Sequence, residues 1–104
     1  MSKRVKMVEN NICGKWIRYV RKGLYDKKHP KMTQEELTAK LQLLGLKIDR
    51  TALSRIESGA RVLSDIEIAC FASALNVPLE FLFFGFNGSL PEITELVLHV
   101  AEDA

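Results

Sequence analysis

The residues TQEELTAKLQLLGLKIDRTALSRIESG, numbers 33–59, carry the strongest structural signal in this chain. They begin with a capping box, in which the Thr33 hydroxyl can accept a hydrogen bond from the backbone N–H of Glu36, whose carboxylate reaches back to Thr33. Leucines then recur at helical spacing, at Leu37, Leu41 and Leu44. Gly45 suits the C-terminal stop of this helix, because glycine readily adopts the left-handed backbone conformation.

A second helix is expected at about residues 50–58, because Asp49 can cap its start and Gly59 can stop its end. Leu53 and Ile56 point to one face of that helix. The opposite face holds polar residues: Arg50, Thr51, Ser54 and Arg55. Two capped helices joined by a short, glycine-containing turn are the plan of a helix-turn-helix unit. The second helix of such a unit presents its N-terminal residues to the major groove of DNA.

Helices are also expected on both sides of this unit. Asn11 can cap the first helix of the chain. The segment 64–67 is a second capping box, whose helix ends near Asn76, and Pro78 opens a short helix after it. The side chains expected to face the core are Ile12, Trp16, Ile17, Val20 and Leu24 in the first of these helices, Ile68, Phe71, Ala72 and Leu75 in the second, and Leu79, Leu82 and Phe83 in the third.

The last segment of the chain predicts one more helix. Ser89 and Glu92 form a third capping box, and an apolar stripe follows it: Ile93, Leu96, Val97 and Val100. This stripe can fold back on the preceding helix or pair with a second copy of the chain, and we expect the pairing. The predicted fold class is all-α: a basic N-terminal arm (1–11), a compact five-helix domain (12–86) and an additional C-terminal amphipathic helix (87–104).

Several motifs at matching spacing carry a family resemblance. They are Ile17-Arg18-x-Val20-Arg21, Thr33-Gln34-Glu35-Glu36-Leu37, Ser54-Arg55-Ile56-Glu57-x-Gly59, the pattern Ala69, Ala72, Ala74 and Leu75, then Val77 and Leu79-x-x-Leu82. On these residues the chain resembles the lambda-repressor-like, or XRE-type, helix-turn-helix family of phage repressors. The resemblance covers roughly residues 12–84, and several motifs together are far more specific than one alone. It implies a lambda-repressor-like domain.

The resemblance also implies roles for particular residues. The base-reading positions of the family fall on Arg50, Thr51, Ser54 and Arg55. An arginine there can bond bidentately to guanine, and a threonine can touch a thymine methyl group. The phosphate-binding positions fall on Thr33, Gln34 and Arg61. The internal ion pair of the family falls on Arg21 and Glu57, which we therefore expect to be a structural pair.

Two departures from the family pattern affect the helix-turn-helix unit. Seven residues separate Leu41 from Asp49, where the family is more compact. The first helix of the unit is therefore expected to run one turn further, to Gly45. Thr38 stands where the family prefers alanine at the contact between the two helices. Its hydroxyl can bond back to a carbonyl of its own helix and be tolerated there.

These residues imply a function and leave alternatives open. We expect sequence-specific binding of double-stranded DNA by a transcriptional regulator, acting as a repressor and as a homodimer on half-sites about one DNA turn apart. One alternative is the DNA-binding antitoxin of a toxin–antitoxin pair, with a protein partner on the C-terminal helix. The other is a helix-turn-helix fold used only for protein–protein contact. Arg50, Thr51 and Arg55 argue against that last option, because protein interfaces favour apolar or aromatic anchors.

The net charge of +2 conceals a strong asymmetry along the chain. Residues 1–31 hold ten basic and two acidic residues, whereas residues 62–104 hold seven acidic residues and no basic one. A chain polarised in this way can turn a positive face to a polyanion, unless folding interleaves the two halves and cancels the field. Four residues flank the start of the helix-turn-helix unit and could steer DNA, although a solvated loop is the better interpretation of each alone: Lys27, Lys28, His29 and Lys31.

Other classes of function find little support. His29 and His99 stand far apart, and both are expected at the surface, so no catalytic grouping is indicated. Cys13 and Cys70 lie in apolar helical patterns and are expected to be free thiols in a reducing cytoplasm. No cofactor or metal is expected. No membrane contact is expected either, because charged residues interrupt the apolar stretch 66–86. The sequence thus predicts a cytoplasmic DNA-binding protein that is not an enzyme.

Overall fold

Five helices make up the part of the chain that the structure, a computed structural model, describes, which is residues 9–87. They are α1 (Gly14–Arg21), α2 (Gln34–Leu43), α3 (Arg50–Glu57), α4 (Asp65–Leu75) and α5 (Leu79–Phe84), and a 3-10 turn at Gly85–Asn87 follows α5. No strand occurs among these residues, so the predicted all-α class is confirmed for them. Most of the predicted arm (1–11) and of the predicted C-terminal helix (87–104) lies outside the described residues.

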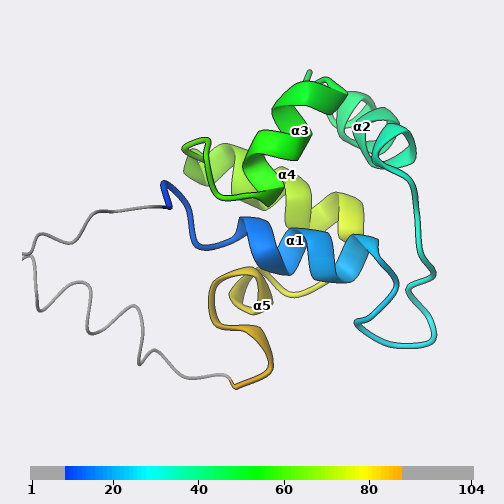
Figure 1. Cartoon of the computed structure of the whole chain (residues 1–104). Coiled ribbons are helices and arrows are strands. Elements are labelled where there is room, and N and C mark those ends of the chain that lie inside the picture. Colours follow the sequence, from blue (N-terminus) through cyan, green and yellow to red (C-terminus); the bar gives the residue numbers. More distant parts are fainter. Residues whose placement is uncertain (1–8, 88–104) are drawn as a thin grey trace, which may run out of the picture.

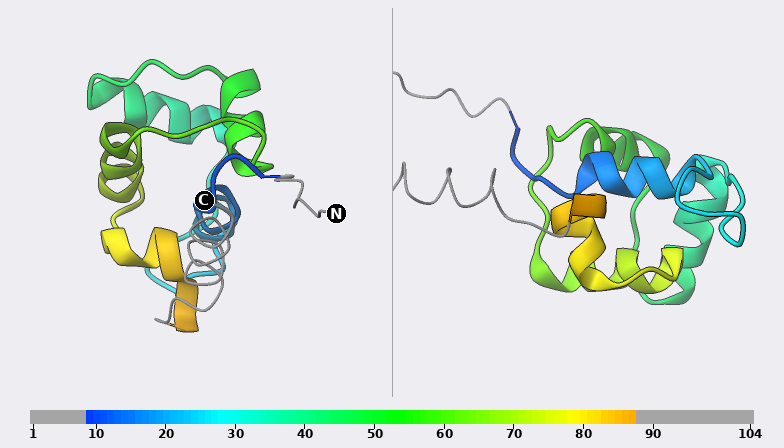
Figure 2. Two further views of the ribbon diagram at one scale, coloured as in Figure 1. Left: turned by 90° about the vertical axis from the view of Figure 1, so that its left-hand side faces the viewer. Right: turned by 90° about the horizontal axis from the view of Figure 1, so that it is seen from below.

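The five helices surround one core (Figures 1 and 2). α1 packs against α3, α4 and α5, while α2 packs against α3 and α4. The pair α2 and α3 lies at one end of the molecule and α5 lies at the opposite end, with α1 between them (Figure 1). The α2–α3 unit is therefore supported on its inner side by α1 and α4.

Apolar side chains from all five helices fill this core. The largest of those that are fully buried include Phe71, Ile17, Leu37, Leu41, Leu53, Ile56, Leu75, Leu82 and Val20. Each of them was predicted to face inward from its helical spacing, and each prediction is confirmed. Burying one such side chain stabilises the fold by about 1.5–3 kcal/mol, so the spacing of these residues is the main reason that the helices pack as they do.

The predicted caps of α2, α3 and α4 are present. The backbone N–H of Glu36 donates to Thr33 Oγ1 over 3.0 Å, and the backbone N–H of Thr33 donates to Glu36 Oε1 over 2.7 Å. Asp49 Oδ1 accepts from the N–H of Ala52 at 2.8 Å, and the 64–67 box makes both of its bonds, at 3.0 and 3.1 Å. The residues that end these helices have positive φ angles: Gly45, Gly59 and Asn76.

Of the two expectations about α2, the one for its length is met only in part and the one for Thr38 is confirmed. The helix ends at Leu43, two residues after Leu41, so most of the extra residues belong to the segment 44–49 that joins α2 to α3, in which Gly45 has a φ of +91°. The hydroxyl of Thr38 donates to the backbone oxygen of Glu35 over 2.9 Å. This bond satisfies the hydroxyl inside its own helix, which lets a threonine stand at this position.

The start of α1 differs from the prediction. The helix begins at Gly14 with Cys13 as its N-cap residue, although Asn11 Oδ1 accepts from the N–H of Gly14 at 2.6 Å. The other end of the Asn11 amide donates to the backbone oxygens of Ile56, at 3.1 Å, and Arg61, at 2.7 Å. The prediction that the Asn11 side chain caps the first helix is therefore confirmed by its bond to Gly14, although Cys13 is the N-cap residue, and the same amide also ties the entry of α1 to the end of α3.

Three side chains predicted to face the core are exposed: Leu24, Leu44 and Leu79. Leu24 follows Gly23, whose φ of +80° turns the chain after α1 has ended. Leu44 is the C-cap residue of α2 and Leu79 is the first residue of α5, so both lie at helix ends, where periodicity determines side-chain direction poorly. In α5, Phe81 is buried in place of Leu79 and packs against rings on the α1 side.

A glycine sets how closely α1 approaches α3. A Cβ atom at Gly14 would lie 1.9 Å from the backbone oxygen of Ile56, which is far inside the contact distance. The close approach therefore requires glycine at this position. Together with the bonds of Asn11, it fixes the C-terminal end of α3 against α1.

Candidate nucleic-acid interface

α3 turns an apolar face to the core and a polar face outward. Leu53 and Ile56 are fully buried. The four residues predicted to read bases are all exposed on the other face: Arg50, Thr51, Ser54 and Arg55. Because Asp49 caps the helix, the first turn that carries Arg50 and Thr51 has a defined backbone. The structure thus brings the four predicted residues together on one short helix.

The two arginines of this face are held loosely. Arg50 Nη1 lies 3.7 Å from Glu35 Oε2 at the start of α2, and the two side chains are 64% and 75% exposed. An exposed pair of this kind contributes about 0–1 kcal/mol, so Arg50 can exchange Glu35 for another acceptor. No ion pair holds Arg55 within residues 9–87. Both guanidinium groups are therefore accessible to a ligand.

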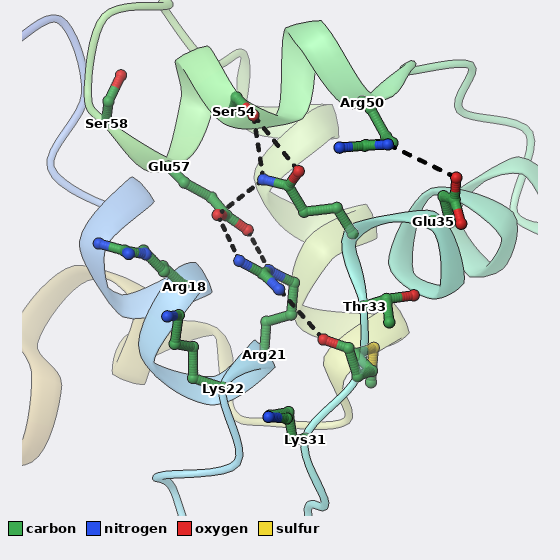
Figure 3. Close-up of a pocket in the computed structure, with 12 residues that line it drawn as sticks. Arg18, Arg21, Lys22, Lys31, Thr33, Glu35, Arg50, Ser54, Glu57 and Ser58 are labelled. Carbon is green, nitrogen blue, oxygen red and sulfur yellow. Dashed lines mark hydrogen bonds and ion pairs between the residues drawn. The ribbon is translucent and has the colours of Figure 1, made fainter.

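Ser54 differs from its neighbours, because its hydroxyl faces the side chain of Gln34. Gln34 Nε2 donates to Ser54 Oγ over 3.1 Å and lies 3.3 Å from Glu57 Oε1, while Ser54 Oγ lies 3.4 Å from Gln34 Oε1 (Figure 3). The two residues that were predicted to contact a base and a phosphate thus contact each other. The contact joins the first residue of α2 to the middle of α3.

Arg21 and Glu57 form the predicted ion pair. Arg21 Nε donates to Glu57 Oε2 over 2.6 Å and Arg21 Nη2 donates to Glu57 Oε1 over 2.9 Å. A third bond runs from Arg21 Nη1 to the backbone oxygen of Met32, at 3.1 Å. The bidentate geometry is the strongest that an arginine and a carboxylate can adopt. It links α1, the segment before α2, and α3.

A hollow of about 720 Å³ opens between α1, the start of α2 and α3 (Figure 3). We call it the basic hollow, because its lining includes Arg18, Arg21, Lys22, Lys31 and Arg50. Figure 3 shows Arg18, Lys22 and Lys31 on one side of it and Arg50 with Glu35 on the other. Among residues 9–87, no ion pair holds Arg18, Lys22 or Lys31.

Sequence reasoning gave Arg18 and Lys22 no role at this surface. The available signal was their spacing of four residues, which places Arg18 of α1 and Lys22, the C-cap residue of that helix, on the same side. Both are exposed. What the sequence did not show is that the exposed side of α1 adjoins the starts of α2 and α3. The two residues thereby extend the basic surface beyond the helix-turn-helix unit.

Arg61, a predicted phosphate contact, lies against an acidic partner. Its guanidinium donates to both carboxylate oxygens of Glu67, at 3.2 and 3.4 Å, and is only partly exposed. Burial raises the pKa of Glu67, but hydrogen bonds from the Ser64 backbone and from Arg61 outweigh it and leave that pKa below its ordinary value. Arg61 thus supports the cap of α4.

Thr33 also uses its side chain within the fold, since its hydroxyl oxygen caps α2.

No group of three His, Cys, Asp or Glu side chains that could hold a metal ion occurs in the described part of the chain. The one sulfhydryl that is fully enclosed there, Cys13, has its pKa raised to about 11 by burial. A thiol in that state is a poor nucleophile at neutral pH. None of the helices between residues 9 and 87 is long and apolar enough to cross a membrane.

Comparison of the chain with protein-family models, with curated proteins and with solved structures found no match.

Proposed function

We propose that this chain binds double-stranded DNA in a sequence-specific manner and regulates transcription, as a repressor that occupies an operator. The observation that carries the proposal is the exposed face of α3, where Arg50, Thr51 and Arg55 stand together. The opposite face of α3 is buried, and its end is fixed by Glu57 and Gly59. A short helix of this kind fits the major groove, whose width admits one α-helix.

Direct base readout would come from α3. Each guanidinium can donate two parallel hydrogen bonds to O6 and N7 of a guanine, which is the commonest specific contact in the major groove. Thr51 can contact a thymine methyl group or donate one hydrogen bond. Ser54 has a different part in this proposal: it holds Gln34 in place, because its hydroxyl faces that amide at 3.1 Å.

The DNA backbone would lie along the basic hollow. The first N–H groups of α2, at Gln34 and beyond, favour an anion, since they belong to a helix N-terminus. Arg18, Lys22 and Lys31 surround that end and add positive charge. Such contacts set affinity and position but do not read sequence. Arg61 is left out of these contacts, because its guanidinium holds Glu67.

The proposed repressor acts as a homodimer. One reading helix makes few base contacts, and a two-fold pair doubles them on a palindromic site. Phe86, in the 3-10 turn that follows α5, is 58% exposed. Because α5 lies at the end of the molecule opposite α2 and α3 (Figure 1), a second copy that contacts this residue would not block DNA. Light scattering on the whole chain and on a chain that lacks 89–104 tests this. A whole chain that is monomeric both in solution and on DNA contradicts the dimer.

Selection of bound sequences from a random duplex pool tests the proposed function. The expected result is an enriched site of two inverted half-sites that contain guanines, with an affinity that falls steeply with salt. A pool that stays random after repeated selection, or binding with no preference among duplexes, would contradict sequence-specific recognition.

A further inference from the structure

His29 joins two segments that are far apart in the sequence. It lies in the loop between α1 and α2, where its Nδ1 is 2.5 Å from Asp26 Oδ1. Its Nε2 is 2.9 Å from the backbone oxygen of Asn76, the residue that ends α4. The ring packs edge-on against Tyr25, with centroids 4.8 Å apart, and the side chain is 17% exposed. His29 thus lies in a surface loop, as predicted, but its ring bonds to two separate segments, which the sequence did not predict.

The hydrogen bonds of His29 define its charge. An ionised carboxylate and a backbone carbonyl can only accept, so both ring nitrogens must donate, and only the imidazolium form has two N–H groups. The bond to Asp26 is the main reason that the pKa of His29 is raised, and the bond to the Asn76 carbonyl adds to it, against a smaller opposite effect of burial. The same bond lowers the pKa of Asp26. The carbonyl also belongs to the negative end of the α4 dipole, which favours a cation.

Other charged groups face the same place from the neighbouring elements. A second hollow, of about 490 Å³, lies beside His29, and its titratable lining consists of Lys28 and Lys31 from the loop and Glu36 and Lys40 from α2. The three lysines disfavour the imidazolium and Glu36 favours it. All four side chains are exposed and therefore screened by solvent. The two direct acceptors at hydrogen-bond distance dominate.

We propose that His29 is a pH-sensitive latch, whose imidazolium form fastens the lysine-bearing loop to the C-terminal end of α4 and so sets the position of that loop beside the DNA-binding surface. The loop carries Lys27, Lys28 and Lys31 and leads directly to Thr33 and Gln34. The part of the inference that concerns DNA rests on the proposed function, whereas the latch itself does not.

Loss of the proton opens the latch. A neutral imidazole has one N–H, so one of the two acceptors then faces a ring lone pair instead of a donor. The stability that the latch contributes is fully present below the ordinary histidine pKa of 6.5, and it is lost as the pH rises through the higher pKa of the folded protein. When His29 loses its proton, the ratio of closed to open latch falls tenfold for each unit by which the pKa of His29 in the folded protein exceeds the ordinary histidine pKa.

Titration of the histidine ring signals by NMR tests the latch, with His99→Gln assigning the two histidines of the chain. The expected midpoint for His29 lies above that of a histidine in an unfolded peptide, and Asp26→Asn lowers it. Amide hydrogen exchange in residues 26–31 should quicken across the same midpoint. The latch is overturned if the midpoint lies at or below the peptide value, or if amide hydrogen exchange in residues 26–31 does not change across that midpoint.

Duplex affinity at constant salt tests the link to DNA, measured from about pH 6 to about pH 8.5, where few other groups titrate. In the whole chain we expect the duplex affinity to fall as the pH rises, with the same midpoint as the titration of His29. In His29→Gln, which has no titrating group at this position, we expect the affinity to stay constant over this pH range. An equal pH dependence in both proteins overturns the link. If neither protein binds any duplex, the proposed function fails, while the NMR titration still decides the latch.

Discussion

The guanidinium of Arg21 and the carboxylate of Glu57 meet in two parallel hydrogen bonds of 2.6 and 2.9 Å, and their side chains are only 11% and 4% exposed. Because Arg21 also donates to the backbone oxygen of Met32, one side chain of α1 holds both the end of α3 and the segment that enters α2. The orientation of the exposed α3 face thus depends on a pair that lies behind it.

Glu57→Ala should destabilise the fold by about 3–5 kcal/mol, because it leaves the Arg21 cation enclosed without its partner. The urea midpoint measures this. Glu35→Ala is the matched control: it removes a carboxylate from an exposed pair with Arg50 and should cost no more than about 1 kcal/mol. Equal urea midpoints for the two variants would show that the enclosed Arg21–Glu57 pair stabilises the fold no more than the exposed Arg50–Glu35 pair does.

Gly14→Ala should be among the most destabilising changes to a small residue, by about 3 kcal/mol, because its methyl group would meet the backbone oxygen of Ile56. Gly45→Ala provides the comparison. It has a φ of +91° but nothing within 4 Å of the added carbon, so only backbone strain of about 1 kcal/mol is expected. Thermal unfolding of both variants decides between steric contact and strain. A Gly14→Ala protein as stable as Gly45→Ala would contradict the close packing of α1 on α3.

Ser54→Ala should weaken binding to all duplexes evenly, by about 0.5–1.5 kcal/mol, because it removes the hydroxyl that faces the Gln34 amide. Affinity for a selected site and for a scrambled site measures this. Ser73→Ala, at an exposed position of α4, should change neither value. A loss confined to the selected site would instead make Ser54 a base-reading residue.

Arg18→Gln and Lys22→Gln should each lower the slope of log K against log salt by about 1, because each removes one phosphate contact without altering base preference. Arg61→Gln should leave the slope unchanged, since that guanidinium is held by Glu67. A reduced slope for Arg61→Gln would restore the phosphate role that the family resemblance implies for it.

The features that could be predicted from the sequence are local ones. The caps at Thr33 and Asp49 close bonds between residues three apart, so the residue types and their spacing suffice. Helical periodicity likewise identified the inward residues in the middle of α1 to α4, whereas in the short α5 it missed the buried Phe81. It failed at helix ends, as Leu79 shows, because neighbouring elements determine which end residue is buried.

The remaining features depend on contacts between distant segments. His29 and the Asn76 carbonyl are separated by 47 residues, and no pattern in the sequence relates them. The contact of Ser54 with Gln34 requires the actual crossing of α2 and α3. The Arg21–Glu57 pair, 36 residues apart, was predicted only through the resemblance to a family.

The most direct test of the α3 interface compares the sequences selected by the whole chain with those selected by Arg50→Ala and Arg55→Ala. Lys40→Ala, which removes an exposed positive charge from α2, serves as the control. Each arginine variant should lose about 1–3 kcal/mol at the original site and lose its preference at one base position, while the control keeps the original site. Arginine variants that bind with full affinity and select the same sequence would contradict base reading by α3.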